Sequence, residues 1–158
     1  MIHLKMLGGT MVIGAGSIAA CCLAAYEKKK LTVLDAWIDL IFHIRGQIDC
    51  YLMPLDEILA CADSAILKGC MCRTPHPDLP ALLRTSSPSL SEESKRLITA
   101  FTKEIGGSYR EEQLKRCDYY IHALRAIREK LAEDLPSRIK MTVSLCICAS
   151  IAAAILLW

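Results

Sequence analysis

Apolar residues dominate both ends of the chain, and a region of mixed apolar and polar positions lies between them. Residues 6–26 contain no Asp, Glu, Lys, Arg or His, and a helix of this length is about 30 Å long, which matches the hydrocarbon core of a bilayer. Residues 141–158 are equally free of these groups, although their length is near the lower limit for crossing a membrane. The pattern predicts one transmembrane helix at each end, the first within residues 1–26 and the second at 141–158.

The middle of the chain begins with the periodicity of an amphipathic helix. Apolar residues recur every three or four positions from residue 34 to 52, which is the pattern of a helix with one buried face. They are Leu34, Trp37, Ile38, Ile41, Ile44, Ile48 and Leu52. Pro54 then favours the first turn of a second helix, with Asp56 and Glu57 near its positive N-terminus, and this helix is predicted to run to Gly69.

Prolines and capping residues divide the second half of the middle region. Four of the six prolines lie in residues 73–90, which excludes a long helix there and leaves room for one short turn around residues 81–83. Ser89 and Glu92 have the spacing of a capping box and predict a helix that ends at Gly106 and Gly107. Residues 108–111 have the same capping-box spacing and predict the start of the next helix. That helix has a heptad seam, which predicts packing along a neighbouring helix or a partner chain, and Pro136 is predicted to kink it. The seam consists of Leu114, Cys117, Ile121, Leu124, Arg128, Leu131 and Leu135.

No segment shows the sustained alternation of a β-strand. The predicted fold class is therefore all-α. We expect an antiparallel cytosolic bundle of about five to six helices at residues 27–140, flanked by the transmembrane helices 1–26 and 141–158.

Positive charge beside the predicted spans indicates their orientation. Residues 28–30 are all lysine and follow the first span, while Arg138 and Lys140 precede the second; such flanks stay on the cytoplasmic side. The protein is therefore expected in the cell membrane as a multi-pass protein with a cytoplasmic central domain. A cleaved secretory signal and a bacterial lipoprotein, acylated at Cys21 of residues 18–21, are the rival interpretations, and the basic run after the span opposes both.

Candidate catalytic and metal-binding chemistry is sparse. The nine cysteines form no CxxC pair, and Cys70 and Cys72, near His76, lack the second pair that a zinc site needs. These thiols are better explained as small apolar residues in a reducing compartment. No HExxH, GxxxxGK[ST] or GxSxG motif is present, and Asp49 with Glu57 is more typical of a solvated surface than of an acid–base couple. Residues 31–140 hold 15 basic and 16 acidic side chains, which gives no footprint for nucleic acid. We expect no enzymatic activity, no cofactor and no metal.

The order of several short motifs resembles the stage III sporulation protein AB family of endospore-forming bacteria. The resemblance is carried by residues 5–8, by the register Leu34, Ile41, Ile44, Gln47-Ile48, Tyr51, Pro54-Leu55 and Glu57-Ile58-Leu59, and later by Ile105-Gly106-Gly107, Arg110-Glu111 and Gln113. The family commonly has an acidic residue where this chain has Gln47, and Pro136 is a second departure.

The resemblance implies a function that periodicity alone does not. It implies a cytosolic domain similar to the helical-bundle domains of the platform proteins of type II secretion and type IV pilus machines. It implies a place in the mother-cell membrane facing the forespore, within a channel complex of other membrane proteins, and docking of a stage III sporulation protein AA-like ATPase on the cytosolic face. Membrane lipid and a second copy of the chain are further expected contacts.

The partner-binding residues expected from this resemblance are Gln47, Asp49, Tyr51 and Pro54. The alternative is that Tyr51 and Pro54 only fix the turn after the first amphipathic helix. A helical membrane adaptor or sensor unrelated to sporulation has the same layout and remains the second interpretation of the whole chain.

Overall fold

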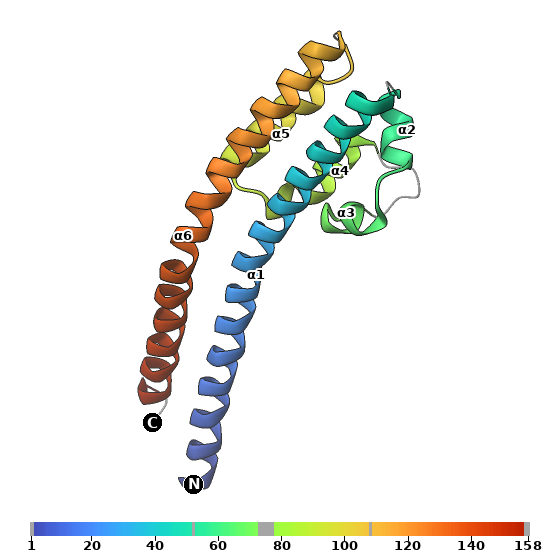
Figure 1. Cartoon of the computed structure of the whole chain (residues 1–158). Helices are drawn as coiled ribbons and strands as arrows, with labels where there is room; N and C mark the ends of the chain where they lie inside the picture. Colours follow the sequence, from blue (N-terminus) through green and yellow to red (C-terminus); the bar gives the residue numbers. More distant parts are fainter. Residues whose placement is uncertain (1, 52, 73–77, 108, 157–158) are drawn as a thin grey trace. The chain divides into compact units, whose positions relative to one another are not determined.

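The computed structural model describes residues 2–51, 53–72, 78–107 and 109–156. All regular structure in these ranges is helical, which confirms the predicted all-α class (Figure 1). The elements are α1 (Ile2–Tyr51), α2 (Leu55–Ala60), α3 (Ser64–Gly69), α4 (Leu79–Ser86), the 3-10 turn η1 (Ser87–Ser89), α5 (Glu92–Glu104) and α6 (Arg110–Leu156).

The two predicted transmembrane segments are not separate helices. The first is the beginning of α1, which also includes the first amphipathic helix, and the second is the end of α6. The sequence Glu-Lys-Lys-Lys at residues 27–30 consists of good helix formers, so nothing ends the helix after the first segment. Pro136 lies inside α6, and the kink expected there stays a prediction.

Capping side chains make two further helix boundaries differ from the predicted ones. The helix predicted from Pro54 to Gly69 is in fact α2 and α3, because the Asp63 side chain accepts a hydrogen bond from the Ala65 backbone N–H at 2.8 Å and starts a new helix. The N-cap of α5 is Ser91 rather than Ser89, since Ser91 accepts from the backbone N–H of Ser94.

The proline-rich region contains a longer helix than the short turn predicted there. α4 has eight residues and begins next to Pro80, a residue that the first turn of a helix tolerates. Residues 73–77, including His76, and Ser108 of the second capping box lie outside the described residues.

Two compact units make up the chain. The central unit is Lys30–Leu131, and the terminal unit combines Met1–Lys29 with Ala132–Trp158. The boundaries predicted at 27 and 140 stay a prediction. In the central unit α1 and α6 are antiparallel neighbours, because Asp35 pairs with Arg128 and, ten residues further along α1, Arg45 pairs with Asp118, ten residues back along α6 (Figure 1).

The core of the central unit lies between α1, α2, α4, α5 and α6. Trp37 and Phe101 are its largest fully buried side chains, and Tyr120 packs edge-on against Phe101 with ring centroids 5.5 Å apart. The predicted seam of α6 contributes Cys117, Ile121 and Leu124 as buried residues, and Leu114 and Leu131 are partly buried beside them. Arg128, the polar member of the seam, pairs with Asp35 at the edge of this core.

Small residues form the contact inside the terminal unit. A side chain at Gly16 would overlap the Ser150 hydroxyl and would come within 2.8 Å of the Ser150 Cβ. Ser150 is held there because its hydroxyl donates to the Cys146 carbonyl at 2.7 Å. Ala20, one turn from Gly16, is 3% exposed. Close approach through small residues is typical of helix pairs in membranes.

One described helix is long and apolar enough to cross a membrane by length and composition. It is Arg110–Ala153 of α6, and none of its apolar stretch is buried within the protein. The side chains of residues 2–10, 12 and 13 lie outside the described part of the chain, and the span predicted at residues 1–26 stays a prediction.

Candidate partner-binding surface

Four helix ends meet at one place in the central unit. A hollow of about 110 Å³ lies between the end of α1, the start of α2, the end of α5 and the start of α6. Its lining residues are mostly apolar: Ile48, Met53, Pro54, Leu55, Ile58, Ile105, Gly106 and Gln113. Folding thus brings together segments that are up to 65 residues apart, from Ile48 to Gln113. We call Asp49, Tyr51, Pro54, Tyr109 and Arg110, which lie at or next to these helix ends, the helix-end surface.

A turn after α5 shapes one side of the hollow. α5 ends at Glu104, Ile105 is buried, and Gly106 has a φ of +96°. Side chains other than glycine rarely adopt this left-handed conformation. The helix predicted to end at Gly106 and Gly107 ends two residues before Gly106, at Glu104, and the glycine lets the chain turn towards α6.

An arginine of α6 joins the end of α1. The Arg110 guanidinium donates through Nη2 to the Asp49 backbone carbonyl at 2.7 Å and also to the Asp49 carboxylate. The last carbonyls of a helix have no partner within the helix, so this contact satisfies one of them as well as pairing two charges. Both side chains keep more than two fifths of their surface exposed, so the pair remains accessible to a partner.

Two tyrosines stand out from this end of the unit. Tyr51, the last residue of α1, is 69% exposed, and Tyr109, directly before α6, is 90% exposed. Tyrosine combines a large apolar ring with a hydroxyl and is enriched in protein–protein interfaces. Their exposure leaves both rings available for contact with another protein.

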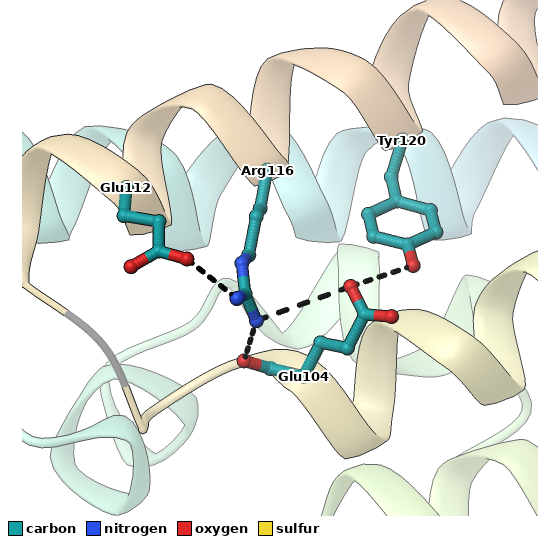
Figure 2. A network of polar contacts seen from close by, with 4 residues as sticks. All are labelled: Glu104, Glu112, Arg116 and Tyr120. Carbon is teal, nitrogen blue, oxygen red and sulfur yellow. Dashed lines mark hydrogen bonds and ion pairs between the residues drawn. The ribbon is translucent and has the colours of Figure 1, made fainter.

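A polar network fixes the end of α5 against α6, as Figure 2 shows. Arg116 donates to the Glu112 carboxylate at 2.6 Å and to the Glu104 backbone carbonyl at 2.9 Å, and the Tyr120 hydroxyl donates to the Glu104 carboxylate at 3.0 Å. Burial, followed by the hydrogen bond to Glu104, raises the pKa of Tyr120 to about 12. Sequence reasoning missed this network; the four-residue spacing of Glu112 and Arg116 was its only visible signal.

The expected partner-binding residues do not all lie in one place. Pro54 lines the hollow, Asp49 pairs with Arg110, and Tyr51 is exposed beside them. Gln47 is half-buried on α1 and is not among the lining residues. Pro54 also fixes the turn, as the alternative interpretation requires, because its carbonyl accepts the first two hydrogen bonds of α2. Binding of a partner by these residues stays a prediction.

Cys70, one of the two cysteines considered as zinc ligands, does not lie in an open binding site. Cys70 is fully buried, and burial raises the pKa of its thiol to about 12. Within the described ranges no three His, Cys, Asp or Glu residues are grouped so that they would hold a metal ion. His76, the third candidate ligand, is outside those ranges.

Comparison with known families supports the resemblance found in the sequence. The model of the family described as stage III sporulation protein AB matches residues 82–158. The match begins within α4 and includes all of α5 and α6. The predicted resemblance is therefore confirmed for this part of the chain. No curated protein and no solved structure matches the chain.

Proposed function

We propose that this chain is a membrane platform component of a sporulation channel complex between mother cell and forespore, and that a cytosolic ATPase docks on its helical domain. The observation that carries the proposal is the family match over residues 82–158. That range includes the apolar part of α6 and two of the four helix ends around the hollow.

Membrane anchoring is supported by the apolar side chains of the terminal unit. Met141, Leu145 and Ile155 of α6 and Met11 and Ile18 of α1 are all exposed. Exposed apolar surface of this extent is unfavourable in water and is solvated by lipid in a membrane. We propose that both terminal segments cross the membrane as a hairpin that packs through Gly16 and Ser150. The basic residues at 28–30, 138 and 140 support a cytoplasmic position of the central unit.

Docking of the ATPase is assigned to the helix-end surface. Tyr51 and Tyr109 offer two exposed rings beside an apolar hollow, and the pairing of Arg110 with Asp49 joins the two helix ends that carry them. Aromatic side chains next to an apolar pocket are typical of the residues that dominate binding energy in interfaces. Asp56 and Glu57, exposed in the first turn of α2 next to Pro54, favour a partner with basic groups.

The chain then anchors the ATPase or transmits its motion, and it has no catalytic step of its own. The test is co-purification of the full chain, in detergent, with the stage III sporulation protein AA-like ATPase encoded in the same genome. A stable complex is expected. Absence of a complex across a range of salt concentrations and nucleotide states would contradict the proposal.

The second candidate function is a helical membrane adaptor or sensor unrelated to sporulation. It is favoured by one observation: the family match does not include α1, α2 and α3. Deletion of the gene separates the two candidates. Loss of spores supports the channel component, and normal sporulation supports the adaptor.

A further inference from the structure

The outward face of α1 in the central unit carries an exposed aromatic ring beside a glycine. Phe42 is 57% exposed, and Gly46 lies one helical turn further on the same face. A Cβ at Gly46 would have no atom within 4 Å. Glycine weakens a helix interior relative to alanine, and nothing in the chain itself requires a glycine here. The ring and the bare backbone next to it are thus suited to the close approach of another helix.

Acidic residues flank this ring at equal distances. Asp35 and Asp49 lie seven residues before and seven residues after Phe42, and Asp39 lies between Asp35 and the ring. Asp35 and Asp49 bind Arg128 and Arg110 yet remain more than two fifths exposed. Asp39 has no ion-pair partner among the residues that the structure describes. We call Asp35, Asp39, Phe42, Gly46 and Asp49 the α1 face.

The outward face of α6 carries an exposed ring and two lysines, together with Glu112, which Arg116 binds, and Glu133. Tyr119 is 62% exposed, and its ring is braced edge-on by the buried Tyr120 with centroids 5.2 Å apart. Lys115 lies four residues before Tyr119 and Lys130 eleven residues after it. Both lysines are exposed and have no ion-pair partner in the described part of the chain. We call Lys115, Tyr119 and Lys130 the α6 face.

We infer that the α1 face binds the α6 face of a second copy of this chain, with the two helices antiparallel. Asp35 and Asp49 are about 21 Å apart along α1, and Lys115 and Lys130 are about 22 Å apart along α6, at 1.5 Å per residue. Consider the register in which Tyr119 of one copy lies over Gly46 of the other. Lys130 of the first copy then lies opposite Asp35 of the second, and Lys115 of the first lies one residue away from the position opposite Asp49 of the second. One aromatic contact and two charge pairs are thus satisfied by a single register.

The same charges disfavour a contact between two identical faces. Asp35 and Asp49 are paired with arginines of their own chain, but two α1 faces would still bring together the Asp39 carboxylates of both copies, which have no such pair among the described residues, and like charges in an interface are unfavourable. The contact is therefore heterologous: each copy uses its α1 face towards one neighbour and its α6 face towards the next. Such contacts close into a ring when the rotation between neighbours allows it. Ring closure rests on the proposed anchoring of all copies in one membrane, whereas the contact itself does not.

The test uses the full chain in detergent under reducing conditions, with self-association followed by sedimentation velocity. The wild-type chain is expected to form oligomers larger than a dimer as concentration rises. Gly46→Gln alters only the α1 face, and the pair Lys115→Glu with Lys130→Glu alters only the α6 face. Each variant is expected to associate at least about tenfold more weakly than the wild type. Phe42→Gln is the replacement for the α1 variant if Gly46→Gln lowers the melting temperature.

Mixing the two variants identifies the geometry. Each retains one intact face, so an equimolar mixture is expected to form a one-to-one dimer and nothing larger. A wild-type chain that stays monomeric, variants that assemble like the wild type, or a mixture that does not pair would each overturn the inference. Binding of the ATPase by Gly46→Gln is expected to equal that of the wild type, so failure of this inference is distinguishable from failure of the proposed function.

Discussion

Trp37 and Ser86 join α1 to α4 through a buried hydrogen bond. The indole Nε1 donates to the Ser86 hydroxyl at 2.9 Å, and that hydroxyl donates in turn to the Leu82 carbonyl at 2.8 Å. Both residues are 0% exposed. The largest side chain of the core is thereby oriented by a serine 49 residues away, and its one polar group is satisfied without water.

Substitution of Ser86 by alanine should therefore destabilise the central unit. Ser86→Ala leaves the buried Trp37 N–H without this acceptor, and an unsatisfied buried donor costs about 1–3 kcal/mol. Ser87→Ala is the matched control, because Ser87 is only half-buried and its hydroxyl forms no hydrogen bond with the residues that the structure describes. The midpoint of urea unfolding, followed by circular dichroism, measures the stability of both variants. Equal midpoints for the two variants would contradict the role assigned to the bond.

Two glycines of α1 provide a test of the packing in the terminal unit. A side chain at Gly16 would overlap Ser150, whereas one at Gly14 would meet no atom within 4 Å. Gly16→Leu is expected to separate the two segments and to increase proteolysis of the full chain in detergent, while Gly14→Leu leaves proteolysis unchanged. Similar proteolysis of the two variants would show that the segments do not pack through Gly16.

Cysteine reactivity should follow burial. Cys50 and Cys61 are exposed. Burial raises the pKa of the Cys70 thiol to about 12 and that of the Cys117 thiol to about 11. A thiol with its pKa three units higher has on the order of a thousandfold less reactive thiolate near neutral pH. Maleimide labelling of the folded chain at pH 7, mapped by mass spectrometry, should modify Cys50 and Cys61 first. In urea, Cys50, Cys61, Cys70 and Cys117 should be labelled equally. Early labelling of Cys70 in the folded chain would be inconsistent with the core described.

The same exposed thiols report the orientation in the membrane. In intact cells an impermeant maleimide is expected to reach Cys50 and Cys61 only after the cells are permeabilised, because the central unit is proposed to be cytoplasmic. These are better probes than Cys70, which is buried. Labelling of Cys50 or Cys61 in intact cells would place the domain outside and would favour the lipoprotein interpretation.

Tyr120 should make stability depend on alkaline pH. Burial and the bond to Glu104 raise its pKa from 10 to about 12, so the folded state favours the neutral phenol. This contribution is fully present below pH 10 and is lost as pH rises towards 12. Tyr120→Phe should be less stable than the wild type at pH 8, by about 0.5–1.5 kcal/mol for the lost hydrogen bond, and the difference should shrink by pH 11.5. A constant difference in unfolding free energy across this range would contradict the assignment.

Much of the fold followed from local patterns in the sequence. The apolar spacing from Leu34 to Ile48 is the buried face of α1, and α5 ends at Glu104, two residues before Gly106 with its positive φ. These features depend on neighbours within one or two helical turns, which is why periodicity and capping residues reveal them. The apolar pattern continues from Ile58 to Ile66 and gives no sign of the new helix that starts after Asp63.

The candidate surface depended on contacts that no local pattern contains. Arg110 binds Asp49 from 61 residues away, and the hollow at the helix ends exists only when α1, α2, α5 and α6 meet. The sequence singled out Tyr51 and Pro54 through a family resemblance, and it gave no reason to choose Tyr109 or Arg110 as their companions. Gln47, expected with them, is half-buried and does not line the hollow.

Binding of the ATPase to the full chain in lipid nanodiscs tests the account most directly. The wild-type chain is expected to bind the stage III sporulation protein AA-like ATPase, and the pair Tyr51→Ala with Tyr109→Ala should weaken this binding at least about tenfold. Tyr119→Ala, which removes an exposed ring from the α6 face, should leave the affinity unchanged. No binding by the wild type, or equal affinities for all three chains, would contradict the claim that the helix-end surface docks the ATPase.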